Sequence, residues 1–215
     1  MSEAAAGWSR LHHGIDPRGN RLLWGWLRGI WWLAAPLARL RVPPLALTVL
    51  GALLAVVAAA GHWPWPAFGL IAGSVLCDAL DGAVALLGEH ATVLGARADK
   101  LADRIADLAF VVVLWRCGAP ALLAAAAAAS VLAVERLREW RGGLLRAQLT
   151  VAERPSRVIC VLLACLCAAV STAHWPATVC AAVLVGLSVI ALAQLTRRAR
   201  ATSGTPVDAD GASAG

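Results

Sequence analysis

Residues 77–103 read CDALDGAVALLGEHATVLGARADKLAD and place four aspartates in an otherwise apolar part of the chain. Asp78 and Asp81 are three residues apart, and Asp99 and Asp103 are four apart. If both segments are helical, each pair shares one face of its helix, about one turn apart. Two such faces turned toward each other predict a cage of four carboxylates.

A cage of this kind needs cations. One aspartate in the middle of a membrane helix costs about 2.5–3.5 kcal/mol, so four without counter-charge cost on the order of 10 kcal/mol. Ligand sets made only of oxygen, with high negative charge, suit Mg²⁺, Mn²⁺ or Ca²⁺ rather than zinc. Two divalent ions balance four carboxylates, and the sequence therefore predicts a paired-metal site.

The composition predicts a protein that crosses the membrane several times. Of 215 residues, 60% are hydrophobic and only 15% are charged, which is far from the usual composition of a soluble domain. About 20 apolar residues make one span, so the length leaves room for six. We predict an all-α integral membrane fold with six transmembrane helices near residues 45–60, 67–87, 92–115, 121–134, 156–170 and 177–195.

The segment before the first predicted span alternates arginines with tryptophans and leucines. This mixture over residues 20–40 is typical of an amphipathic helix that lies in the membrane interface, although a full transmembrane span is the alternative. We therefore divide the chain into a cytoplasmic arm with an interfacial helix (1–43), a six-span catalytic domain (44–197) and a disordered tail (198–215).

The basic residues predict the orientation in the membrane. Only Arg116 falls on the side that holds the predicted turns at 61–66, 116–120 and 172–176, and the other Lys and Arg residues lie on the face of the acidic site. Because positive residues accumulate on the cytoplasmic side, we expect both termini and the acidic site to face the cytoplasm.

The spacing of the acidic stretch resembles the signature of the CDP-alcohol phosphatidyltransferases. The matching positions are Asp78, Asp81, Gly82, Ala85, Gly95, Asp99 and Asp103. One position departs from the family pattern, which has an arginine directly after the alanine where this chain has Leu86. That arginine is expected to help hold the nucleotide diphosphate, and Arg97 is a candidate substitute.

The resemblance implies a transferase that moves a phosphatidyl group from CDP-diacylglycerol to an alcohol acceptor and releases CMP. It implies two Mg²⁺ or Mn²⁺ ions held by the four aspartates, with Asp103 also acting as the catalytic base. It further assigns CDP binding to Asp81, Gly82, Ala85 and Gly95. Membrane lipids and a second copy of the chain, in a homodimer, are the expected partners, and no nucleic acid is expected.

A group of arginines on the same face predicts the acceptor. The segment Glu153-Arg154-Pro155-Ser156-Arg157 resembles the start of the fifth span in the phosphatidylinositol phosphate synthases of this family. This implies a phosphorylated polyol, such as inositol phosphate or glycerol phosphate, bound by Arg136, Arg154 and Arg157. The competing interpretation is that these arginines mark the cytoplasmic side and attract anionic lipids.

Two other functions remain open at this point. Buried acids also occur in cation and proton transporters, although a transporter does not require the glycines and the alanine of the signature. A catalytically impaired relative that still binds CDP-lipid is the other alternative, because of Leu86. Among the remaining polar residues, Arg104 and Asp107 are expected to pair with each other, and His90 lies near the site.

Overall fold

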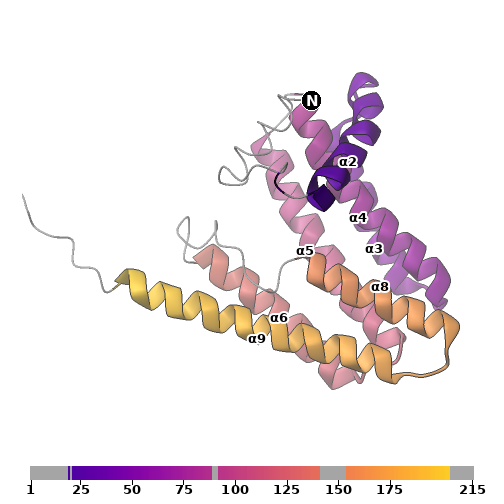
Figure 1. The fold of residues 1–215 in the computed structure, drawn as a ribbon, viewed down its shortest axis with the longest axis vertical. Helices are drawn as coiled ribbons and strands as arrows, with labels where there is room; N and C mark the ends of the chain where they lie inside the picture. Colours follow the sequence, from indigo (N-terminus) through magenta and orange to yellow (C-terminus); the bar gives the residue numbers. More distant parts are fainter. Residues whose placement is uncertain (1–18, 20, 89–91, 141–153, 204–215) are drawn as a thin grey trace, which may run out of the picture.

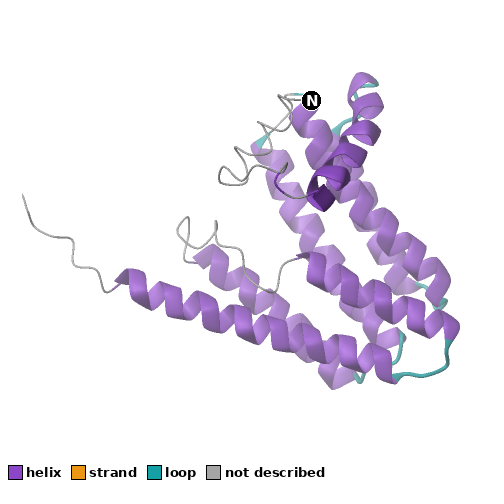
Figure 2. Cartoon of the chain, in the orientation of Figure 1, coloured by secondary structure: helices purple, strands orange, loops and turns teal. Residues whose placement is uncertain are grey.

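The computed structural model describes residues 19, 21–88, 92–140 and 154–203. Within these residues the chain forms seven helices and no strand, so the predicted all-helical fold is confirmed (Figures 1 and 2). The helices are α2 (Arg21–Arg39), α3 (Pro44–Ala60), α4 (Pro64–Leu87), α5 (Val93–Arg116), α6 (Ala121–Trp140), α8 (Arg154–Val170) and α9 (Trp175–Ser203). Each predicted span has one helix in the corresponding place.

The helix starts follow from local sequence. Pro44 and Pro64 stand in the first turns of α3 and α4, where the missing N–H of proline costs no hydrogen bond. Thr92 caps α5, because its hydroxyl accepts a hydrogen bond from the Gly95 N–H at 3.0 Å. These caps fix where α4 and α5 begin, and hence how far along each helix the aspartates lie.

The turns α3–α4, α5–α6 and α8–α9 gather at one end of the molecule, at the lower right of Figure 1. The Arg116 guanidinium donates a hydrogen bond of 2.9 Å to the Gly61 carbonyl, which joins the first two turns. Gly118 lies against His174, which joins the second to the third. The aspartates are therefore at the opposite ends of α4 and α5 from these turns.

Helix α2 packs one face on α4. Its residues Leu27, Ile30, Trp31 and Ala34 are buried, at the i, i+3, i+4, i+7 spacing of an amphipathic helix, against Leu80, Ala83 and Val84. Trp32, on the other face, is 78% exposed. The predicted amphipathic helix is thus present, and its interfacial position stays a prediction.

The main core lies among the remaining helices, around Ile71, Phe110, Leu114 and Val161. Two helical stretches, Pro64–Leu87 and Trp175–Arg197, are long and apolar enough to cross a membrane, and α3 is a shorter apolar helix. The other helices are shorter or carry charged residues at the ends near the acidic site.

Candidate metal centre and substrate cavities

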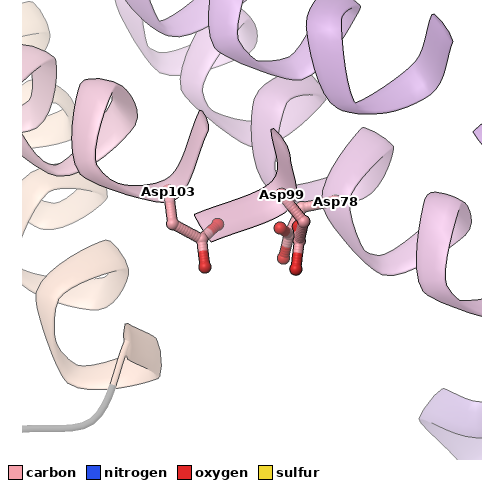
Figure 3. Close-up of side chains that lie close together, drawn as sticks. All are labelled: Asp78, Asp99 and Asp103. Atoms are coloured by element: carbon pink, nitrogen blue, oxygen red, sulfur yellow. The ribbon is translucent and has the colours of Figure 1, made fainter. Parts of the chain in front are cut away.

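Three of the four predicted aspartates form one cluster. Asp78 comes from α4, and Asp99 and Asp103 come from α5, and each offers a carboxylate oxygen within 4.8 Å of the others. Figure 3 shows the three side chains directed into the same space. Three converging carboxylates form the kind of all-oxygen, negatively charged donor set that holds Mg²⁺ or Mn²⁺. The donor set therefore fits the predicted metal.

Asp81, the fourth predicted ligand, lies outside this group of three. Its side chain is buried, and its Oδ2 accepts a hydrogen bond of 2.5 Å from the hydroxyl of Thr48 in α3. Sequence reasoning missed Thr48, although a lone hydroxyl in the apolar run 45–60 was a usable signal. The hydrogen bond fixes Asp81 beside the cluster, and its role as a ligand stays a prediction.

Arg154, at the start of α8, provides positive charge beside the cluster. Its Nη1 donates to Asp78 Oδ1 at 2.5 Å and also contacts the carboxylate of Asp103. This arginine, which was predicted to bind the acceptor, thus contacts two of the candidate metal ligands. One guanidinium partly offsets the repulsion among three carboxylates and holds α8 against α4 and α5.

A cavity of about 520 Å³ opens on one side of the cluster. The predicted CDP-binding residues Asp81, Gly82, Ala85 and Gly95 all line it, together with Asp99 of the cluster. Neither Leu86 nor Arg97 is among its lining residues. The structure therefore brings the four predicted nucleotide residues to one cavity, and it gives no support to Arg97 as the substitute cation.

A second cavity, of about 180 Å³, also adjoins the cluster. Asp103 lines it, so this one aspartate belongs both to the cluster and to the smaller cavity. The remaining lining residues are all charged: Lys100, Arg104, Asp107, Glu135, Arg138, Glu139 and Arg157. The cluster consequently contributes one aspartate to a large mixed cavity and another to a small polar one.

The ion pairs of the smaller cavity correct one prediction. Arg104 does not pair with Asp107: it contacts Glu139 of α6, whereas Asp107 pairs with Arg157 of α8 at 3.3 Å. The i, i+3 spacing of Arg104 and Asp107 allowed a pair within α5, but α6 and α8 bring oppositely charged partners close to both residues. These pairs connect α5, α6 and α8 around the cavity.

The remaining polar residues divide between the two ends of the molecule. Of the three predicted acceptor arginines, Arg157 lines the smaller cavity, whereas Arg136 is exposed and is not among its lining residues. His62 and His174 lie at the end that holds the turns, away from the cluster. His90 lies outside the described residues.

Comparison with known proteins decides the family. The CDP-alcohol phosphatidyltransferase model matches residues 41–192, which include both halves of the site. The chain belongs to the CDP-alcohol phosphatidyltransferase family. No relative among curated proteins matches it.

Two solved structures similar to this family member are both of the phosphatidylinositol phosphate synthase of Mycobacterium tuberculosis. One, a complex with manganese and citrate, has a TM-score of 0.64 at 24% identity and covers 86% of this chain and 93% of that one. The other, with CDP-DAG bound, has a TM-score of 0.62 at 25% identity and covers 87% of this chain and 100% of that one. The fold of this phosphatidyltransferase is therefore that of the synthase.

Proposed function

We propose that this phosphatidyltransferase moves a phosphatidyl group from CDP-diacylglycerol to the hydroxyl of an alcohol. The hydroxyl oxygen forms a bond to the phosphorus of the diacylglycerol phosphate, the bond from that phosphorus to the oxygen of CMP breaks, and CMP leaves. The observation that carries the proposal is that the carboxylate cluster adjoins two cavities of different character, one lined by Asp99 and the other by Asp103.

The larger cavity is proposed to hold the nucleotide. Its volume of about 520 Å³ is within the range of small-molecule sites. The lining residues Gly82, Ala85 and Gly95 have small side chains or none, which leaves room for the cytidine and its phosphates. The likeness to a synthase whose structure contains bound CDP-DAG supports this assignment.

The metal is proposed to bind the cluster. Asp78, Asp99 and Asp103 would hold Mg²⁺ or Mn²⁺, with Asp81 as a further ligand, in line with the manganese complex of the similar synthase. When bound, such ions neutralise charge on phosphoryl oxygens. The protein's own contribution is to fix these carboxylates: the Thr48 hydroxyl holds Asp81, and the Arg154 guanidinium holds Asp78 and Asp103.

Asp103 is proposed as the catalytic base. It is the one aspartate of the cluster that also lines the smaller cavity, so an alcohol bound there lies beside its carboxylate. A carboxylate oxygen that accepts the hydroxyl proton makes the alcohol oxygen a better nucleophile. Arg154, which donates to Asp103, fixes the orientation of that carboxylate.

The acceptor is proposed to be a phosphorylated polyol, such as inositol phosphate or glycerol phosphate. Arg157 lines the smaller cavity, is buried, and its Nε makes no hydrogen bond with any described residue. A guanidinium that lines a cavity can donate hydrogen bonds to a phosphate oxygen. Arg136 is a weaker candidate because it is exposed and does not line this cavity, and Arg154 contacts Asp78 and Asp103 just as Arg157 pairs with Asp107.

The membrane topology is also proposed. Helices α3, α4, α5, α6, α8 and α9 would make six spans, with both termini and the site on the cytoplasmic side. Large apolar side chains on the outside of the bundle support this, among them Leu53, Leu122 and Leu163, each at least 50% exposed. The positive-inside pattern supports the orientation, and a homodimer remains a prediction from the family.

A CMP-release assay tests the function. Purified protein with Mg²⁺ or Mn²⁺ and labelled CDP-diacylglycerol is given inositol phosphate, glycerol phosphate, inositol or serine. We expect CMP to appear with a phosphorylated polyol. If CDP-diacylglycerol binds but no acceptor yields CMP, the chain is the catalytically impaired relative. Cation or proton flux in vesicles, without binding of CDP-diacylglycerol, would establish the transporter instead.

A further inference from the structure

Arg41 has an uncommon backbone conformation at the turn between α2 and α3. Its φ is +56°, and it is the only described residue other than glycine with a positive φ. The Arg41 N–H donates to the Ala38 carbonyl and the Val42 N–H to the Leu37 carbonyl, each at 3.0 Å. This pair of bonds closes a helix with a left-handed residue, a position that glycine usually occupies.

The left-handed conformation costs stability for a residue with a Cβ, and glycine would adopt it without that cost. Strained backbone persists where the surrounding structure enforces it, and such positions cluster at functional sites. An arginine at this position therefore suggests that its side chain has a function that glycine could not provide.

The position of Arg41 indicates what that function is. It lines the cavity of about 520 Å³, together with Asp81, Gly82, Ala85 and Asp99. The two other charged lining residues are aspartates, so Arg41 is the single cation among the described residues that line the cavity. Among the described residues, Arg41 is therefore the one that offers positive charge to a nucleotide diphosphate entering this cavity.

The family signature has its cation elsewhere. Its arginine follows the alanine, where this chain has Leu86, and Leu86 is not among the lining residues of the cavity. Two other cations close in sequence, Arg97 and Lys100, are not among them either. Leu86 directly follows Ala85, which does line the cavity, whereas Arg41 brings a guanidinium into the lining itself.

We propose that Arg41 supplies the guanidinium that binds the diphosphate of the nucleotide, in place of the arginine that the family carries after Ala85. A guanidinium can donate two parallel hydrogen bonds to one phosphate. The inference rests on the proposed function for the nature of the ligand, and it names a binding residue that the signature does not contain.

The test is Arg41→Gly, which removes the guanidinium and also relieves the backbone. Binding of CDP is measured by titration calorimetry at saturating Mg²⁺, and the melting temperature is measured on the same samples. We expect a Kd for CDP about 10- to 100-fold higher, as for the loss of a charged hydrogen bond, with a melting temperature equal to or above that of the parent. Arg39→Ala, at an exposed arginine two residues earlier, is the matched control and should leave both values unchanged.

A second variant separates binding from folding. Leu86→Arg, added to Arg41→Gly, returns a cation to the family position. The Kd for CDP of the double variant is expected to be at least tenfold lower than that of Arg41→Gly alone. A Kd for CDP within threefold of the parent in Arg41→Gly would overturn the proposal. So would a loss of affinity accompanied by a lower melting temperature that Leu86→Arg does not reverse.

The outcomes also distinguish this inference from the proposed function. If the parent protein binds CDP through Arg41 but releases no CMP with any acceptor, the transferase assignment fails and the role of Arg41 stands. If the parent releases CMP and Arg41→Gly has the parent's KM for CDP-diacylglycerol, the transferase stands and the role of Arg41 fails.

Discussion

Replacing Asp103 by asparagine is predicted to separate catalysis from nucleotide binding in this phosphatidyltransferase. Asparagine has nearly the same shape, so the packing of α5 is expected to persist, but the side chain can no longer accept the hydroxyl proton. Asp103 lines the smaller cavity and belongs to the cluster, and it is not among the lining residues of the larger cavity. The substitution should therefore abolish transfer while CDP binding remains detectable.

The structure allows the size of the effect to be estimated. Loss of a positioned base lowers a rate by about 10²- to 10⁴-fold, which corresponds to about 2.7–5.5 kcal/mol in the activation free energy. Loss of one of three clustered carboxylates adds to this by weakening the metal site. We expect CMP release to fall at least 10³-fold, and the Kd for CDP to rise by less than tenfold.

The assay is CMP release under saturating acceptor, with calorimetric CDP binding on the same preparation. Asp107→Asn is the matched control, one turn further along α5: Asp107 lines the smaller cavity but does not belong to the cluster. It should retain more activity than Asp103→Asn. Activity of Asp103→Asn within tenfold of the parent would refute the assignment of the base.

Two further predictions concern a tightly packed glycine and a buried hydrogen bond. Gly118→Ala should lower the melting temperature by several degrees, because Gly118 has φ +110° and a Cβ there would lie 2.5 Å from Nδ1 of His174. Gly186→Ala, where a Cβ meets nothing within 4 Å, is the control, and an equal loss in both variants would contradict this reasoning. Thr48→Val should lower the free energy of unfolding by about 1–3 kcal/mol and raise the KM for CDP-diacylglycerol, because Asp81 loses its hydroxyl donor. Unchanged thermal unfolding and KM would show that this hydrogen bond does not matter.

Sequence patterns predicted the helices well, because the signals are local. Apolar runs bounded by prolines and glycines fixed the places of α3 and α4, and the alternation of arginine with tryptophan and leucine predicted α2. The spacing within 77–103 predicted that Asp99 and Asp103 share a face, and the structure places both in the cluster with Asp78. The helix positions and the shared face of Asp99 and Asp103 depend on residues within a few turns of one another.

Contacts between distant residues were beyond such patterns. Arg154 lies 76 residues from Asp78 in sequence and contacts it, and Arg104 pairs with Glu139 of α6 rather than with Asp107. Spacing tells which residues share a helix face, but not which other helix lies opposite that face. For the same reason sequence patterns did not single out Arg41, which is recognised by its backbone conformation and by the cavity that it lines.

The proposed chemistry requires above all that the cluster binds a divalent cation. Anomalous diffraction from crystals grown with Mn²⁺ tests this directly, with Asp99→Asn crystals as the comparison. We predict an anomalous peak among the carboxylates of Asp78, Asp99 and Asp103, at about 2.0–2.3 Å from their oxygens, that is weakened or lost in the variant. A parent crystal with no manganese at these three carboxylates, or with the ion bound elsewhere, would contradict the account.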